Sequence, residues 1–139
     1  MNPYSIFFPS LTLMIFTYLA LVQIPWRRFR AYFRHEVGPE DFKCSESGKV
    51  PESVVIPNRV FMNLLEMPVM FYAVSVMIYV ADKTDGTFIV LAWMYVALRI
   101  VHAVIFLTSN HILSRFLTFA ISNVLLLLAL IRFAVLIAA

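Results

Sequence analysis

Four apolar runs dominate the sequence, and their length constrains the fold more than any other feature. They cover residues 5–24, 60–81, 87–107 and 116–137. Each is close to the ~20 residues that an α-helix needs to cross the hydrocarbon core of a bilayer. Open strands and irregular backbone are excluded inside lipid, because their unpaired N–H and C=O groups would be costly there. The runs therefore predict four membrane-spanning helices.

Composition supports this prediction and bounds the number of domains. Hydrophobic residues make up 62% of the 139-residue chain and charged residues only 14%, whereas soluble domains are ~45–50% apolar and ~25% charged. Because the four runs use up most of the chain, residues 1–139 are predicted to form one all-α domain, an integral membrane four-helix bundle. The first run is expected to be retained as a span, since no basic residue precedes it and no small-residue cleavage site follows it.

The distribution of basic residues predicts the topology. The longest connection, 26–58, contains the following Lys and Arg residues: Arg27, Arg28, Arg30, Arg34, Lys43 and Lys49. The connection 82–86 contains only Lys83. By the positive-inside rule, loop 26–58 and the turn 108–115 face the cytoplasm, and both termini lie on the opposite side. The net charge of +3 therefore reflects topology, with contacts to anionic membrane lipids as a secondary role, and it does not indicate nucleic-acid binding.

The chain has one cysteine, Cys44, in this loop. A single cysteine excludes an intramolecular disulfide. Because nothing near it marks a stabilised thiolate, we expect an inert thiol rather than a catalytic one.

A polar stripe interrupts the second apolar run. Arg59, Asn63 and Glu66 stand at i, i+4 and i+7, which places them on one face of a helix. Glu66 would lie roughly 9 Å inside the start of the span. An isolated charge inside the bilayer costs at least ~2.5–3.5 kcal/mol, so Glu66 is expected to have a partner or a water-filled cavity.

The third run offers such partners, because Arg99 and His102 share one face at i and i+3. They lie ~12 Å and ~7 Å from the predicted cytoplasmic end, at depths that bracket Glu66. One interpretation is a buried Glu66–Arg99 pair that only fixes helix docking. The other is a cytoplasm-facing site for a small zwitterionic or anionic ligand, favoured because Arg59 and Asn63 extend the stripe to the surface and because Pro68 loosens the helix nearby.

His102 by itself fits a hydrogen-bonded bundle residue as well as a functional one. No second His or Cys stands at ligand spacing on the predicted helices, so no metal site is predicted.

The pattern Arg59-x-x-x-Asn63-x-x-Glu66, followed closely by Pro68, resembles the signature of the membrane-associated proteins in eicosanoid and glutathione metabolism, the MAPEG family. Residues 91–116, LAWMYVALRIVHAVIFLTSNHILSRF, are similar to the third helix and turn of bacterial members. The resemblance covers nearly the whole chain. It implies a homotrimer of four-helix subunits in a bacterial inner membrane, with a glutathione site between neighbouring subunits that opens toward the cytoplasm.

The resemblance also implies roles for the polar residues. Arg59, Asn63 and Glu66 would hold glutathione, with the arginine meeting a carboxylate and the glutamate meeting the amino group. Arg99 matches the arginine of the family's third helix, and His102 falls where the eukaryotic enzymes place a tyrosine, so the resemblance implies that both also contribute to the glutathione site.

Catalysis in this family requires a cation or hydroxyl donor that stabilises the glutathione thiolate, which is the nucleophile. The resemblance suggests Arg115 for this role, and the doublet Arg27-Arg28 resembles a basic pair near the active site. Phe106 stands where a tyrosine would be expected. The implied function is a glutathione-dependent transferase or peroxidase acting on lipophilic small molecules, and the alternative is a non-catalytic binding or scaffold protein. A transporter is disfavoured because the polar groups cluster in the cytoplasmic half.

Overall fold

The computed structural model describes residues 2–43 and 46–138. Cys44 lies outside the described residues. A short 3-10 helix, η1 (Pro3–Ile6), leads into α1 (Phe7–Phe33), and η2 (Pro39–Phe42) lies in the following loop. The remaining helices are α2 (Glu52–Glu66), α3 (Pro68–Val80), α4 (Gly86–Leu107) and α5 (Ile112–Ala138). No β-strand occurs among these residues, which confirms the all-α prediction.

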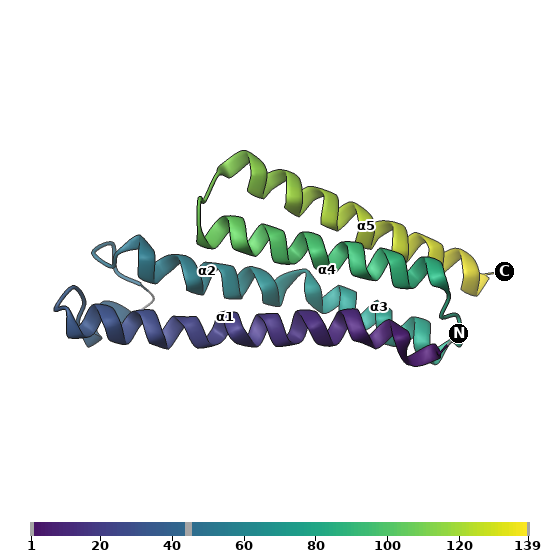
Figure 1. The fold of residues 1–139 in the computed structure, drawn as a ribbon, viewed down its shortest axis with the longest axis horizontal. Coiled ribbons are helices and arrows are strands. Elements are labelled where there is room, and N and C mark those ends of the chain that lie inside the picture. Colours follow the sequence, from purple (N-terminus) through teal and green to yellow (C-terminus); the bar gives the residue numbers. More distant parts are fainter. Residues whose placement is uncertain (1, 44–45, 139) are drawn as a thin grey trace.

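The helices lie side by side as an elongated antiparallel bundle (Figure 1). Helices α2 and α3 run back along α1, and α4 and α5 form a second antiparallel pair that packs on them. Counting α2 and α3 together, the described chain has four helical segments long and apolar enough to cross a membrane. Both ends of the chain lie at one end of the bundle, and the α1–α2 loop and the α4–α5 turn lie at the other. We call these the terminal end and the loop end.

Two predicted boundaries differ from the structure. Helix α1 continues past residue 24 to Phe33, and α2 begins at Glu52 rather than near residue 60. The connection predicted as 26–58 is therefore reduced to residues 34–51. The reason is that helical hydrogen bonding does not require apolar side chains. Beyond the apolar runs, a small hydrophobic cluster holds the two helices together, formed by Ala31, Val37, Val50 and Val54.

The second span is interrupted at Pro68, as the sequence predicts. Pro68 has no N–H to donate to the carbonyl of Leu64, so α2 ends at Glu66 and α3 begins at the proline. Met67, between them, keeps helical dihedral angles of φ −65° and ψ −35°. The two helices therefore form one candidate span with a gap in its hydrogen bonding, and α2 ends within the length of that span.

Side chains from all four spans form the main core, including Leu13, Leu64, Phe71, Tyr95 and Leu126. The rings of Phe71 and Tyr95 pack with their centroids 4.7 Å apart. The hydroxyl of Ser10 donates to the hydroxyl of Ser75 at 3.3 Å, which links α1 to α3. Because lipid tails are as apolar as leucine, this packing and hydrogen bonding replace the hydrophobic driving force that assembles soluble bundles.

An ion pair joins α4 and α5 at the terminal end. Asp85 caps α4 by accepting a hydrogen bond from the Phe88 N–H at 2.9 Å, and its other carboxylate oxygen pairs with Arg132. Partial burial alone would raise the pKa of Asp85, but the Phe88 N–H and Arg132 outweigh it and hold the pKa below its usual value. The Arg132 guanidinium also lies 5.2 Å from the centre of the Phe88 ring. Arg132 is thus held within the bundle.

Candidate functional site

A cavity of about 300 Å³ opens at the loop end, where α2, α4 and α5 converge. Its lining comes from Asn63 of α2, His102 of α4 and four residues of α5, namely Ile112, Arg115, Phe116 and Phe119. Three residues selected from the sequence, Asn63, His102 and Arg115, are therefore brought together within one chain. Because these three residues belong to three different helices, the site depends on how α2, α4 and α5 pack together.

Arg99 lies completely buried next to this cavity, with 0% of its surface exposed. One guanidinium nitrogen, Nη2, donates to the backbone carbonyl of Asn63 at 2.7 Å and to its side-chain oxygen, Oδ1, at 3.0 Å. Nε and Nη1 have no hydrogen-bond partner among the described residues. The positive charge faces the carbonyl end of α2, where the helix dipole favours a cation.

A pair between Glu66 and Arg99, which was one of the two interpretations of the sequence, is not formed. No ion pair among the described residues includes Glu66 or Arg99. Glu66 and Arg59 both lie on an exposed face of α2, whereas Asn63 between them is partly buried. The stripe therefore follows the edge of the single chain, and only its middle residue turns inward to the cavity.

His102 is oriented by a hydrogen bond to α5. Its Nδ1 lies 2.9 Å from the backbone carbonyl of Arg115. Because a carbonyl can only accept, Nδ1 carries the proton of this bond. The other ring nitrogen, Nε2, is buried and has no partner among the described residues. The ring packs between Phe106 and Phe119, with centroid distances of 6.2 and 5.7 Å.

Arg115 is held by the turn between α4 and α5. Its guanidinium carbon lies 3.3 Å from the centre of the Phe106 ring, and its Nη1 donates to the side chain of Asn110. Asn110 adopts a left-handed backbone conformation with φ 50°, which asparagine tolerates better than most residues. Phe106, at the position where the resemblance expects a tyrosine, supplies the face of an aromatic ring to the cation in place of a hydroxyl.

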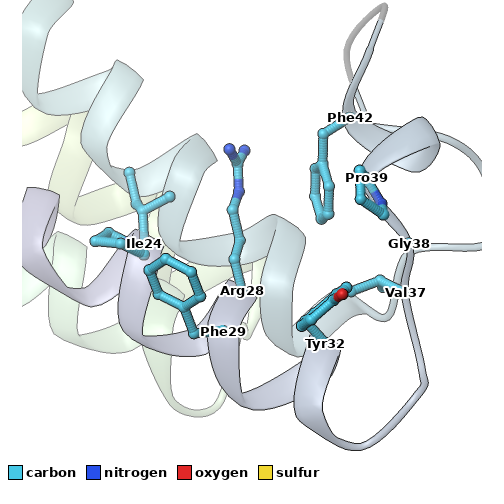
Figure 2. Close-up of a pocket in the computed structure, with 9 residues that line it drawn as sticks. Ile24, Arg28, Phe29, Tyr32, Val37, Gly38, Pro39 and Phe42 are labelled. Atoms are coloured by element: carbon cyan, nitrogen blue, oxygen red, sulfur yellow. The ribbon is translucent and has the colours of Figure 1, made fainter.

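Arg28 lies at a different cavity, of about 490 Å³, between the end of α1 and the loop (Figure 2). The lining is mostly apolar and includes Ile24, Phe29 and Tyr32 of α1 together with Val37, Pro39 and Phe42. Arg28 pairs with Glu46 at 3.2 Å and lies 4.5 Å from the centre of the Phe42 ring. The structure therefore does not bring Arg28 into the cavity of Arg115 within one chain.

Asp41 fixes the shape of the loop beside Arg28. Its two carboxylate oxygens accept hydrogen bonds from the Gly38 N–H at 2.9 Å and from the Ser47 hydroxyl at 2.7 Å. These bonds, the first more than the second, hold the pKa of Asp41 below its usual value. The ionised carboxylate is thus part of the loop structure.

The sequence analysis did not select Phe119, although it contributes to the cavity and lies 5.4 Å from the Arg99 guanidinium. Its position four residues after Arg115 places both on one face of α5, so helical spacing was the available signal. Among the described residues, no group of three or more His, Cys, Asp or Glu side chains is placed to hold a metal ion.

These features define the class of protein as a multi-pass helical membrane protein with a cavity at one end of the bundle that combines apolar side chains with Asn63, His102 and Arg115. Comparison with protein families identifies the group. The chain matches the MAPEG family over residues 6–135, and it belongs to that family. Neither curated proteins nor solved structures gave a match. The resemblance noted in the sequence is therefore confirmed at the level of the family.

Proposed function

We propose that the chain is a membrane-bound, glutathione-dependent transferase or peroxidase that acts on lipophilic electrophiles or hydroperoxides. The observation that carries the proposal is the convergence of Asn63, His102 and Arg115 on one cavity. Nε2 of His102 and Nε of Arg115 are buried and have no hydrogen-bond partner in the part of the chain that the structure describes, and a buried polar group without a partner is costly. Membership of the MAPEG family, which is associated with glutathione, supports the same ligand.

Four polar residues have roles in this proposal. Arg59 binds a glutathione carboxylate and Glu66 its ammonium group, while Asn63 hydrogen-bonds the peptide between them. Arg115 stabilises the thiolate, which makes more of the nucleophilic form available at neutral pH. In the transferase reaction the sulfur forms a bond to an electrophilic carbon, and the leaving group departs with its bonding electrons. Lipophilic substrates reach the site through the bilayer.

The exposure of Arg59 and Glu66 supports a homotrimer. Both residues are exposed in the single chain and belong to the helical segment Glu52–Val80, which is long and apolar enough to cross a membrane. A carboxylate that faces lipid costs at least ~2.5–3.5 kcal/mol, and a neighbouring subunit packed on this face would remove that cost. The same neighbour would bring its own Arg28 toward the cavity that holds Arg115. Native mass spectrometry of the detergent-solubilised protein tests the trimer, and a monomer would remove the role of Arg28.

We also propose that the loop end faces the cytoplasm and that both termini lie outside it, in a bacterial inner membrane. Support comes from the basic residues near the end of α1, Arg27, Arg28, Arg30 and Arg34. Alkaline phosphatase fused after the C-terminus is expected to be active, because this enzyme folds only outside the cytoplasm. An inactive fusion, with normal amounts of protein, would reverse the topology.

Ligand binding is tested by thermal unfolding in detergent. At a glutathione concentration ten times its Kd, a single site stabilises the folded protein by about 1.4 kcal/mol. We expect Glu66→Gln and Arg59→Ala to remove this gain. Glu52→Gln, which changes an exposed acid at the start of α2, is the matched control and keeps it. If millimolar glutathione does not stabilise the parent protein, the glutathione assignment is wrong.

Two assays separate an enzyme from a binding protein. Conjugation is followed with a chromogenic aryl halide, and peroxide reduction with a lipid hydroperoxide and glutathione. The alternative, a non-catalytic binding or scaffold protein, is favoured by one observation: the six residues that line the cavity include no hydroxyl side chain. Glutathione binding with rates equal to the uncatalysed background in both assays would support that alternative.

A further inference from the structure

The contact between Arg99 and Asn63 determines which way the Asn63 amide points. Nη2 of Arg99 lies 3.0 Å from the Asn63 side-chain oxygen. An arginine has only donors, so the atom that faces it must be the oxygen and not the amide nitrogen. This removes the usual ambiguity between the two ends of an asparagine side chain. The NH₂ group of Asn63 therefore points away from Arg99.

Three features keep this arrangement in place. The same nitrogen of Arg99 also binds the Asn63 backbone carbonyl at 2.7 Å, so the side chain and main chain of Asn63 are held together. Arg99 itself is completely buried, and the Phe119 ring lies 5.4 Å from its guanidinium carbon. Its charge also lies at the carbonyl end of α2, close to the break in helical hydrogen bonding at Pro68.

We propose that Arg99 is a positioning residue that does not bind the ligand and that holds Asn63 with its NH₂ group toward the cavity. Next to the Asn63 NH₂ group, the site then recognises a hydrogen-bond acceptor on the ligand, either a carboxylate or a peptide carbonyl. It excludes ligand groups that can only donate. Glu66, one helical turn further on, recognises the opposite kind of group. The inference rests on the proposed function, because it assigns the glutathione group next to Asn63 as a carbonyl or carboxylate and not the ammonium.

Asn63→Asp is the most direct test, because it has nearly the same shape and replaces NH₂ by oxygen. The new carboxylate still accepts from Arg99, but it presents an acceptor to the cavity. We expect the Kd for glutathione to rise at least tenfold without a fall in the melting temperature of the ligand-free protein. If Asn63 instead offered its oxygen to a ligand donor, Asn63→Asp would bind glutathione as tightly as the parent, and this result would overturn the inference.

A double-mutant cycle separates positioning from a general structural role. Arg99→Met releases the Asn63 amide and is expected to raise the Kd about tenfold, which corresponds to ~1.4 kcal/mol. In an Asn63→Ala background the same change is expected to alter the Kd less than twofold, because no amide remains to be oriented. Equal losses in the two backgrounds would show that Arg99 acts only through the fold. If Arg99→Met does not fold, Arg99→Gln replaces it in the cycle, because a neutral amide can both donate and accept and no longer fixes the orientation of Asn63.

Ligand-free unfolding distinguishes failure of this inference from failure of the proposed function. Asn63→Asp is expected to raise the melting temperature in the parent protein, because it gives Arg99 a charged acceptor. In the Arg99→Met or Arg99→Gln background it is expected to lower the melting temperature, because the cation that would pair with the new carboxylate is absent. A change that does not depend on residue 99 would disprove the contact, whatever the ligand. If the dependence is found and glutathione does not bind, the amide orientation stands and the ligand assignment fails.

Discussion

The two ends of the α4–α5 pair use arginine differently. At the terminal end, Arg132 lies beside the Phe88 ring and pairs with Asp85. At the loop end, Arg115 lies over the Phe106 ring, but its side-chain partner is the neutral Asn110. The aromatic contact is therefore common to both ends, and the carboxylate is present at only one. Within this helix pair, Asp85 neutralises the charge of Arg132 at the terminal end, whereas Arg115 at the loop end has no carboxylate partner among the described residues.

Unpaired N–H groups do not by themselves distinguish the two ends. Nε of Arg132 has no partner among the described residues, and the same is true of Nε of Arg115. What differs is that Arg99, His102 and Arg115 are gathered near one cavity without an ion pair in the described chain. Charge without a counter-ion in a cavity is typical of a ligand site, and charge paired at a helix end is typical of structural stabilisation.

Replacing each of the two arginines separately by glutamine is expected to give the largest difference between the two ends. Arg115→Gln removes the cation that stabilises the thiolate, and we expect kcat for conjugation to fall by a factor of ~10²–10³, as for loss of a single stabilising donor in other enzymes. Arg132→Gln is the matched control at the other end and is expected to leave kcat unchanged. Steady-state kinetics in detergent or liposomes measure both. Similar losses for the two variants would mean that the charge at the loop end has no special role.

Asp85 provides the corresponding test at the terminal end, where we expect an effect on stability and none on ligand binding. Asp85→Ala removes both the helix cap and the partner of Arg132, and we expect a loss of about 1–2 kcal/mol in the free energy of unfolding. Arg132→Met removes only the ion pair, which is partly exposed, and should cost about 0.5 kcal/mol. Denaturant-induced unfolding in mixed micelles measures the difference. Neither variant should change the Kd for glutathione, and a change would show that the terminal end contributes to binding.

The sequence predicted the elements of the fold better than their ends. Apolar runs of bilayer length and the chemistry of Pro68 are local properties, and both predictions are confirmed. The extension of α1 to Phe33 and the early start of α2 were missed. These segments are not apolar, and they are stabilised by contacts such as those of Ala31 and Val54, which depend on two helices packing together.

For the candidate site, spacing along a helix predicted which residues share a face, but not which of them point toward the neighbouring helices. Arg59, Asn63 and Glu66 share one stripe, yet packing of α2 on α4 directs only Asn63 inward, so Arg99 contacts Asn63 and not Glu66. The rotation of one helix against another is set by side chains along the whole interface. The place of Arg28 in a catalytic site depends, in our proposal, on a neighbouring subunit.

The smallest expected effect concerns the loop end, where the partly buried carboxylate of Asp41 stabilises the loop through hydrogen bonds. Its pKa is lowered in the folded loop by the Gly38 N–H and the Ser47 hydroxyl. Its contribution is therefore fully present above the unfolded value, near 3.8, and is lost as the pH falls through the lower folded value. We expect amide protection in residues 46–50, corrected for intrinsic exchange, to be constant from pH 7 to about 5 and to decrease only below ~4.

Two variants isolate this effect from general acid unfolding. Asp41→Asn is expected to show reduced protection in residues 46–50 at all pH values, with a weaker pH dependence. Glu40→Gln, which changes a neighbouring acid whose only ion-pair partner among the described residues is Lys43, should retain the parent profile. If Glu40→Gln and Asp41→Asn behave alike, the pH response belongs to the charge of the loop as a whole and not to the hydrogen bonds of Asp41. The loop end would then owe its shape to screened surface charge, unlike the fixed ion pair at the terminal end.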